Sequence, residues 1–295
     1  MALVSPNFII FTIPPQEFKK HLMKKHLAIL FLLFSFSSFA QKDRTYKSFE
    51  EAFKNPAQVY RLKVTYRNLD SIPTDIYKLV NLEKLELNNN DLKFIPKELC
   101  SLPNLKELNL FRNKLTSLPE NFGDLKKLER CILTSNKLKQ LPASMGQLKN
   151  LKELSIKDNK LTSLPNEICN LKILEQFFLS YNDIKALPDS IGKMIGLVHL
   201  YIGNNDLQFL PESTSKLVNL KYFYMEKNEM LYFPSALCSL TNLKELDLSY
   251  CGALGFLPDC LKNISLLDVL IMDTGQTLPF QASRFHNPSL KVIVQ

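Results

Sequence analysis

The sequence contains no Trp and is poor in two residues that often build sites, with only 8 Gly and 4 His among its 295 residues. Two of the His lie in a leading segment that we expect to be removed, which leaves His199 and His286. No Cys/His spacing suits zinc, no Gly-rich phosphate loop is present, and no nucleophile has a plausible base partner. We therefore expect no catalytic site, no metal site and no cofactor, and a protein that is not an enzyme.

The formal net charge of +8 is not concentrated in one basic patch. Residues 1–40 carry a net +3, and the remaining +5 is spread over the rest of the chain, where Lys alternates with Glu and Asp. Interleaved charges of both signs are typical of a solvated surface. The sequence therefore argues against a nucleic-acid partner.

Residues 23–40 have the layout of a secretory signal peptide. Two Lys precede an apolar stretch over 27–36, and small residues lead to a predicted cleavage point between Ala40 and Gln41. A bilayer crossing needs about 20 apolar residues, so a retained membrane anchor is the weaker alternative. We expect no stable membrane insertion after cleavage and a protein exported to the periplasm, the cell surface or the medium.

Residues 1–22 fit neither a signal peptide nor the pattern that follows. We interpret them as an upstream extension from a mis-assigned start codon, with Met23 as the true start.

Ten of the 16 Pro recur at nearly constant spacing, and from Val59 onward the chain fits a 23-residue template. The template reads Leu-x-x-Leu-x-Leu-x-x-Asn-x-Leu-x-x-Leu-Pro-x-x-x-x-x-Leu-x-x. It predicts ten units over 59–289 and a closing strand over 290–295. The units begin at Val59, Leu82, Leu105, Leu128, Leu151, Leu174, Leu197, Leu220, Leu243 and Leu267.

Each unit combines a short strand, a turn and a return segment. The Leu-x-Leu core alternates between buried and exposed side chains, as in a strand. The Asn amide can bond backbone groups of its own and the neighbouring unit, and Pro fixes the return of the chain. Because each unit buries its core only against its neighbours, the array is one continuous domain.

Two sets of residues give the chain a resemblance to the leucine-rich-repeat family, in its short form with a Leu-Pro pair. They are Leu118-Pro119, Leu141-Pro142, Leu164-Pro165, Leu187-Pro188 and Leu210-Pro211, and the turn residues Asn90, Asn113, Asn136, Asn159, Asn182, Asn205 and Asn228. The resemblance implies an α/β repeat: a curved solenoid with a parallel sheet on its concave face and irregular or short helical segments on its convex face. It also implies recognition of a protein partner.

The ends of the array need covers, because terminal units would otherwise expose their core. Ser48 followed by Glu51 has the spacing of a helix capping box, and Phe49 and Phe53 are available to pack on the first unit. This pattern predicts an N-terminal capping helix within 41–58. The opposite end is less regular, since Gly275 replaces the Asn of the template.

The six Cys invite a disulfide interpretation, but their register favours buried free thiols. Cys100, Cys169 and Cys238 share the nineteenth position of their units and lie three units apart, beyond bonding reach. Cys131 takes a Leu position. Cys251 takes the Asn position, and a bridge between Cys251 and Cys260 stays open as an alternative.

The third, fifth and seventh positions of a unit should face away from the core, with the eighth at the strand's exit. Position five carries three successive aromatic residues, and neighbouring strands lie about 4.8 Å apart, so we expect a ladder across units six to eight. Position three adds two rings beside it, and position eight adds two at its rim. The predicted partner-binding residues are Phe178, Tyr201, Tyr224, Tyr222, His199, Tyr181 and Tyr250.

The leading hypothesis is an exported protein-recognition module that binds through its concave face. Two alternatives stay open: a glycan-binding protein, in which the ladder stacks on sugar rings, and a structural envelope spacer that binds nothing. A smaller second candidate surface comprises Phe111, Arg112, Arg130 and Ile132.

Overall fold

The computed structural model describes residues 42–252, 254, 258–273, 287 and 289–295. The predictions for residues 1–22 and 23–40 and for Gly275 lie outside the described residues. The chain divides into two compact units at Arg44. The second unit, Thr45–Gln295, is called the repeat domain below.

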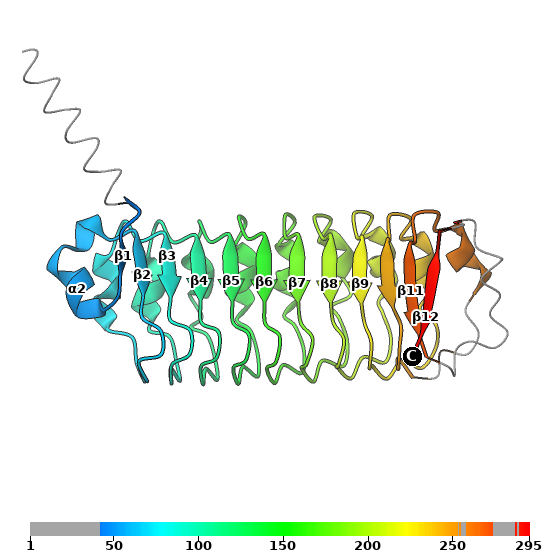
Figure 1. Cartoon of the computed structure of the whole chain (residues 1–295), viewed down its shortest axis with the longest axis horizontal. Helices are drawn as coiled ribbons and strands as arrows, with labels where there is room; N and C mark the ends of the chain where they lie inside the picture. Colours follow the sequence, from blue (N-terminus) through cyan, green and yellow to red (C-terminus); the bar gives the residue numbers. More distant parts are fainter. Residues whose placement is uncertain (1–41, 253, 255–257, 274–286, 288) are drawn as a thin grey trace, which may run out of the picture. The chain divides into compact units, whose positions relative to one another are not determined.

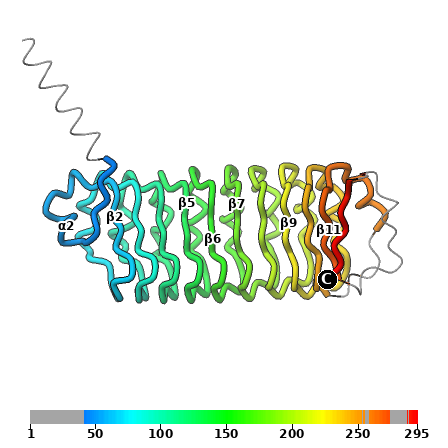
Figure 2. Tube along the Cα trace, in the orientation of Figure 1, coloured from blue at the N-terminus to red at the C-terminus, as the bar shows by residue number. Residues whose placement is uncertain are grey.

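The described strands of the repeat domain form one uncurled parallel sheet of 12 strands, in which each strand pairs with its neighbours in chain order (Figures 1 and 2). The strands are β1 (Thr45–Tyr46), β2 (Arg61–Lys63), β3 (Lys84–Glu86), β4 (Glu107–Asn109), β5 (Arg130–Ile132), β6 (Glu153–Ser155), β7 (Gln176–Phe178), β8 (His199–Tyr201), β9 (Tyr222–Tyr224), β10 (Glu245–Asp247), β11 (Val269–Met272) and β12 (Lys291–Val294).

The alternation of side chains sets which face of each strand is buried. In β3, Leu85 is fully buried while Lys84 and Glu86 on either side of it are partly exposed. Leu85 pairs in register with Leu108 of β4, which pairs with Cys131 of β5. The inward residues therefore form a continuous column, and the core extends through the whole stack.

The return segments lie behind the sheet and are mostly 3₁₀-helical (Figure 1). Pro fixes φ and lacks an amide proton, so it stands before the helical turn; Pro142 precedes one that buries Met145. The turns are η1 (Pro56–Gln58), η2 (Thr74–Lys78), η3 (Lys97–Ser101), η4 (Phe122–Asp124), η5 (Ala143–Gln147), η6 (Asn166–Asn170), η7 (Ile191–Lys193), η8 (Glu212–Lys216), η9 (Ser235–Ser239) and η10 (Asp259–Asn263).

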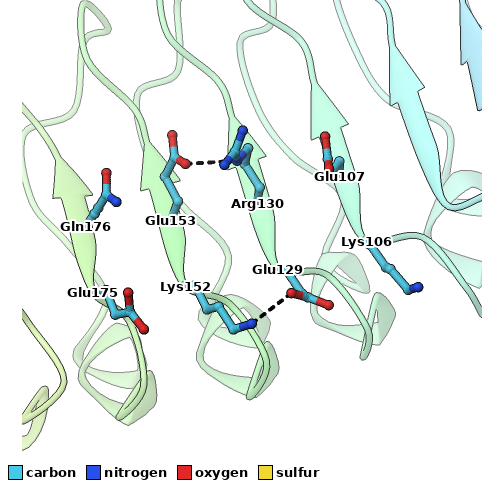
Figure 3. Close-up of a pocket in the computed structure, with 8 residues that line it drawn as sticks. All are labelled: Lys106, Glu107, Glu129, Arg130, Lys152, Glu153, Glu175 and Gln176. Carbon is cyan, nitrogen blue, oxygen red and sulfur yellow. Dashed lines mark hydrogen bonds and ion pairs between the residues drawn. The ribbon is translucent and has the colours of Figure 1, made fainter.

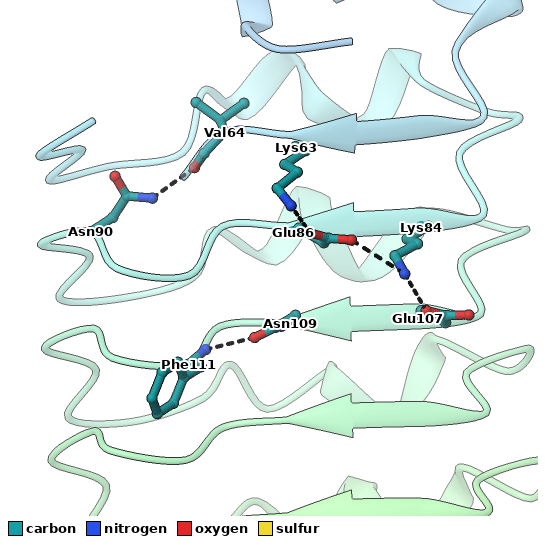
Figure 4. Close-up of polar contacts among 8 residues, drawn as sticks. All are labelled: Lys63, Val64, Lys84, Glu86, Asn90, Glu107, Asn109 and Phe111. Atoms are coloured by element: carbon teal, nitrogen blue, oxygen red, sulfur yellow. Dashed lines mark hydrogen bonds and ion pairs between the residues drawn. The ribbon is translucent and has the colours of Figure 1, made fainter. Parts of the chain in front are cut away.

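The turn Asn joins neighbouring units as the template predicts. The Nδ2 group of Asn159 donates to Ile156 O in its own unit at 3.1 Å and to Leu133 O in the preceding unit at 3.0 Å. Its Oδ1 accepts the Leu138 amide proton at 3.0 Å. Asn90 occupies the equivalent place in the second unit and donates to Val64 O (Figure 4). The buried amides therefore satisfy backbone groups that the turn removes from the sheet.

The N-terminal end is covered by α2 (Phe49–Lys54), which begins after Ser48. The Ser48 hydroxyl accepts the Glu51 amide proton at 3.1 Å, and the Glu51 carboxylate accepts the Lys47 amide proton. Phe49 is buried, and Phe53 packs against it. At the other end, β12 pairs with β11 and closes the sheet.

The free-thiol prediction is right for four Cys and wrong for two. Cys100, Cys131, Cys169 and Cys251 are free and buried, whereas Cys238 is bonded to Cys260. Cys260 directly precedes Leu261, the buried residue of η10. That place lies against the nineteenth position of the preceding unit, as Ser144 lies against Gly123, and the Cα atoms of the bonded pair are 5.4 Å apart. The alternative bridge between Cys251 and Cys260 is thereby excluded. The Cys251 thiol instead donates to Met225 O at 2.8 Å.

Candidate functional site

The three position-five aromatic side chains stack on one another, as their register predicts. Phe178 pairs with Tyr201, and Tyr201 pairs with Tyr224, on successive strands β7, β8 and β9. The ring centroids are 4.9 Å apart in the first pair and 4.6 Å in the second, with interplanar angles of 22° and 5°. Because the centroid spacing matches the distance between strands, the rings stack without bending the sheet. These three residues are called the ladder below.

A second row of rings runs beside the ladder at position three. His199 stacks on Tyr222 at 4.5 Å and lies 6.4 Å from Tyr201, with rings nearly parallel in both pairs. Burial lowers the pKa of His199, and the positive charge of Lys221 adds to this effect. The imidazole is therefore held in its neutral form at neutral pH, as a flat ring within an aromatic surface.

The stacking decides which part of each ring meets solvent. Tyr201 has Phe178 on one side and Tyr224 on the other, so both of its faces are covered. What it presents outward is its ring edge and its hydroxyl group. Burial raises the pKa of Tyr201, and the nearby Glu245 carboxylate raises it further, so its hydroxyl keeps its proton and can donate a hydrogen bond.

The ladder ends on a carboxylate. The Tyr224 hydroxyl donates to Glu245 Oε2 on β10, the next strand. Burial, followed by this hydrogen bond, raises the pKa of Tyr224. The position-five residue that follows Tyr224 is Asp247.

Asp247 corrects the expectation that the outward positions are free of the core. Only 7% of its surface is exposed, and its Oδ1 accepts both the backbone and the hydroxyl protons of Ser249. At position seven, Ser180 and Ser249 are likewise buried. A template of positions alone does not show this burial.

The two predicted rim residues have an unusual backbone. Tyr181 and Tyr250 are half-exposed and have φ values of 61° and 55°, in the left-handed region that disfavours L side chains. The same conformation recurs at the eighth position of other units, which place there Asn89, Arg112, Ser135, Asp158, Asn204 and Lys227. Asn and Asp tolerate it better than Tyr. Neither backbone preference nor core packing explains a tyrosine at these two sites. A third such residue, Tyr66, lies in the first unit.

The strand face of units two to five is charged and internally paired. Lys84 contacts Glu86 at 3.2 Å and Glu107 at 2.9 Å, and Lys63 contacts Glu86 at 3.1 Å (Figure 4). Further along the sheet the pairs Arg130 to Glu153 and Lys152 to Glu129, each at 2.9 Å, line a shallow depression (Figure 3). The acidic and basic side chains in this part of the face therefore neutralise each other's charge.

The second candidate surface from the sequence falls in this charged part. Arg130 is engaged by Glu153. The Arg112 guanidinium lies 5.0 Å from the centre of the Phe111 ring, in the adjoining turn. Both cationic groups therefore have partners within the chain.

An open groove of about 430 Å³ lies at the start of β7 to β9, and the sequence reasoning missed it. Its lining is mixed: Ile173, Ile195, Gly196 and Val198 are apolar, and Lys172, Glu175, Asn219 and Lys221 are polar or charged. In most units the twenty-third position holds an Asn whose Nδ2 donates to the preceding unit, as Asn150 does to Lys126 O and Asn219 to Ile195 O. Ile173 and Gly196 interrupt this series and line the groove. A loss of the edge Asn in two consecutive units was the signal that could have located it.

Family models match the chain along most of the repeat domain. A model described as a leucine-rich repeat region matches residues 96–177 and 150–250, together more than half of the chain. Models described as a leucine rich repeat match residues 57–115 and 242–264. The chain belongs to the leucine-rich-repeat family.

Three solved structures resemble this chain at 27–30% identity. A leucine-rich-repeat protein of Leptospira interrogans is 28% identical with a TM-score of 0.68, and the match covers 86% of this chain and 76% of that one. The ectodomain of the Arabidopsis thaliana receptor kinase GASSHO1/SCHENGEN3, in complex with CASPARIAN STRIP INTEGRITY FACTOR 2, is 27% identical with a TM-score of 0.70. PEPR1 in its structure with AtPEP1 is 30% identical with a TM-score of 0.67.

The matches differ in how much of each protein they span. The match with GASSHO1/SCHENGEN3 covers 81% of this chain and the match with PEPR1 covers 76%, but each covers only 33% of the other chain. The comparison with curated proteins gave no match.

Two further findings concern this leucine-rich-repeat chain within its described ranges. No group of three or more His, Cys, Asp or Glu side chains there is arranged to hold a metal ion. No helix in the same ranges combines the length and the apolar character that crossing a bilayer requires.

Proposed function

We propose that this chain is an exported, non-enzymatic recognition module that binds a protein partner through the strand face of units six to nine. The observation that carries the proposal is the ladder, with the His199 and Tyr222 rings beside it on the partly exposed side of the sheet. Stacked rings form a rigid surface, so little conformational entropy is lost when a partner covers them.

The rim tyrosines add support. Tyr181 and Tyr250 hold half-exposed rings on a backbone conformation that costs of the order of 1–2 kcal/mol for an L side chain. The left-handed backbone recurs at the eighth position of the first nine units, so the feature that supports binding is the half-exposed aromatic ring that Tyr181 and Tyr250 place there.

Two other findings are consistent with the proposal. One of the solved structures named above is a receptor-kinase ectodomain in complex with CASPARIAN STRIP INTEGRITY FACTOR 2. The bond between Cys238 and Cys260 supports export, because disulfides persist mainly in oxidising compartments.

The stacking geometry favours a protein partner over a glycan. Sugar recognition by aromatic residues needs an open ring face. Both faces of Tyr201 are covered by its neighbours, so the ladder offers a sugar ring only the outer faces of its two end residues. A purely structural spacer would account for the ladder as sheet stabilisation, worth about 0.5–1.5 kcal/mol per ring pair, but not for the tyrosines at the rim.

The test is cross-linking capture in the cells that make the protein, comparing the wild type with Tyr201→Ala/Tyr224→Ala. The matched control is Tyr66→Ala/Tyr77→Ala, which removes two exposed tyrosines from the first unit. We expect a protein that is captured by the wild type and by the control and lost with the ladder variant, while circular dichroism shows both variants folded.

Other outcomes separate the alternatives. Recovery of the same proteins by all three chains would contradict binding at the ladder. Ladder-dependent retention on immobilised glycans, without a protein partner, would replace the proposal by the glycan alternative. No change in either assay, together with a large loss of stability, would indicate a spacer.

A further inference from the structure

The carboxylates of the strand face fall into two groups that differ in their partners. In units two to five, Glu86, Glu107 and Glu153 each contact a Lys or Arg nitrogen at 3.2 Å or less. Each of these carboxylates is therefore paired with a basic side chain. A partner would gain little there, since it would first have to displace an existing ion pair.

Units eight and nine carry three carboxylates whose contacts are with neutral groups. Glu245 accepts from the Tyr224 hydroxyl, Asp247 from Ser249, and Glu226 Oε1 from Asn204 Nδ2 at 3.2 Å. Among the described residues, no Lys, Arg or His nitrogen lies within 4.0 Å of these three carboxylates. The aromatic surface is thus bordered by negative charge that the described part of the domain does not neutralise.

Among these three carboxylates, that of Glu226 has an oxygen atom without a hydrogen bond. Its Oε2 atom is inaccessible to solvent and has no hydrogen-bond partner. The side chain lies over Gly203, where a Cβ atom would stand only 2.0 Å from Oε1. Burial raises the pKa of Glu226, and Lys227 is close enough to oppose this shift although it forms no ion pair. A desolvated carboxylate without a cation is unfavourable, and an arriving positive group would offset that cost.

The aromatic rows point to the same ligand chemistry. Cations bind at tyrosine rings, and the planar guanidinium of Arg can stack on a ring while it donates to a carboxylate. Tyr224 stands at the end of the ladder and already contacts Glu245. Ring and carboxylate are therefore adjacent, which is the arrangement that favours Arg over an uncharged side chain.

We infer that the protein partner inserts a cationic side chain, Arg above all, between the end of the ladder and Glu245, with the carboxylates of Glu226 and Asp247 adding negative charge nearby. This inference rests on the proposed function, because it specifies the chemistry of a partner bound at the same face. In this arrangement the rings of the ladder contact the partner, and the carboxylates of units eight and nine bind its positive charge.

The experiment selects peptides from a displayed random dodecapeptide library on the immobilised full chain. Selections are run in parallel on Tyr201→Ala/Tyr224→Ala, on Glu226→Gln/Glu245→Gln, and on Glu107→Gln/Glu153→Gln as the matched charge control. We expect peptides that depend on the two tyrosines to be enriched in Arg or Lys. The enrichment should persist with the control and disappear with Glu226→Gln/Glu245→Gln.

A second measurement tests the charge directly. Replacing the selected Arg by citrulline keeps the shape of the side chain and removes its charge. Binding to the wild type should weaken about ten-fold or more, as for the loss of a charge-assisted hydrogen bond. Binding to Glu226→Gln/Glu245→Gln should change less than about two-fold. Unfolding midpoints of all variants verify that each chain is folded.

The outcomes distinguish the two proposals. Tyrosine-dependent peptides without Arg or Lys enrichment, or with equal citrulline sensitivity on both chains, overturn the cationic partner and leave the proposed function standing. If no selected peptide depends on the tyrosines, protein binding at the ladder is overturned, and the cationic partner with it.

Discussion

Tyr224 on β9 donates its hydroxyl proton to Glu245 on β10, so the aromatic and acidic parts of the strand face are joined by a hydrogen bond. Replacing Tyr224 by Phe removes that bond and keeps the ring in the ladder. We expect Tyr224→Phe to lower the free energy of unfolding by about 1 kcal/mol. Tyr224→Ala should lower it by about a further 1 kcal/mol because the stack on Tyr201 is also lost.

Urea unfolding at neutral pH measures both changes. Equal losses for the Phe and Ala variants would mean that the ring itself contributes nothing to stability.

Replacing Tyr181 by Asn should separate stability from binding. Asn tolerates the left-handed backbone at this position better than Tyr, so Tyr181→Asn should raise the free energy of unfolding by up to about 1 kcal/mol. The gain in stability is limited because the variant also loses the contact between Lys157 Nζ and the Tyr181 ring, whose centre is 4.9 Å away. The same variant should weaken capture of the partner, because it removes one of the two tyrosines at the rim of the aromatic surface.

Tyr66→Asn is the matched control, since Tyr66 has the same conformation in the first unit. We expect Tyr66→Asn to have a higher free energy of unfolding than the wild type and to capture the partner as well as the wild type does. If the two variants weakened capture equally, the rim would have no specific role.

The contributions of two carboxylates, Glu226 and Glu86, to the free energy of unfolding should change in opposite directions with pH. The pKa of Glu226 is raised, chiefly by burial. Its folded state therefore prefers the protonated form, and ionisation destabilises the fold as pH rises past the ordinary value of 4.5. The pKa of Glu86 is lowered, because hydrogen bonds from Lys63 and Lys84 outweigh the effect of burial. Its stabilising contribution is present above that value and is lost as pH falls.

Unfolding free energies of Glu226→Gln and Glu86→Gln, measured at pH 4, 5.5 and 7, test these signs. Relative to the wild type, Glu226→Gln should gain stability between pH 4 and 7, whereas Glu86→Gln should lose stability over the same range. Parallel slopes for the two variants would contradict the assignment.

The buried turn amides should be among the most sensitive positions of the array. Asn159→Ala removes hydrogen bonds to Leu133 O, Ile156 O and the Leu138 amide, and leaves buried backbone groups unpaired. We expect a loss of about 3 kcal/mol in the free energy of unfolding. Asn150→Ala, which removes one exposed bond to Lys126 O, should cost less than about 1 kcal/mol. Chemical denaturation of both variants makes the comparison.

The disulfide should stabilise the C-terminal end of the domain. Cys238 and Cys260 close a loop with a sequence separation of 22, for which chain entropy predicts about 3 kcal/mol. We expect Cys238→Ser/Cys260→Ser to lower the unfolding midpoint and to make it insensitive to reductant. Cys100→Ser should retain the reductant dependence of the wild type, because burial raises the pKa of the Cys100 thiol to about 12 and keeps it unreactive.

The repeat pattern was sufficient to predict the fold and the ladder. A 23-residue period fixes which residues lie side by side on neighbouring strands, so Phe178, Tyr201 and Tyr224 could be placed together from their spacing alone. The same rule failed for Cys238 and Cys260, because it compared only equal positions. The nineteenth position of one unit in fact lies against the seventeenth of the next, as Gly123 lies against Ser144.

Features that depend on conformation or on side-chain reach were not predictable from positions. The template gives the residue at position eight but not its left-handed backbone, so the strain at Tyr181 became visible only in the structure. The contact between Tyr224 and Glu245 joins position five to position three of the next unit, across the rows rather than along them. The hollow that admits Glu226 exists because Gly203 lacks a side chain.

The separation of core and surface along each strand affects how this molecule can change during evolution. Gain or loss of one whole unit leaves the buried column intact and moves the charged and aromatic parts of the face apart or together by one strand spacing, about 4.8 Å. Duplication of a unit therefore changes the distance between the two parts by a fixed amount. For a partner that contacts both parts, the distance between its contacts would change while the residues in each contact stayed the same.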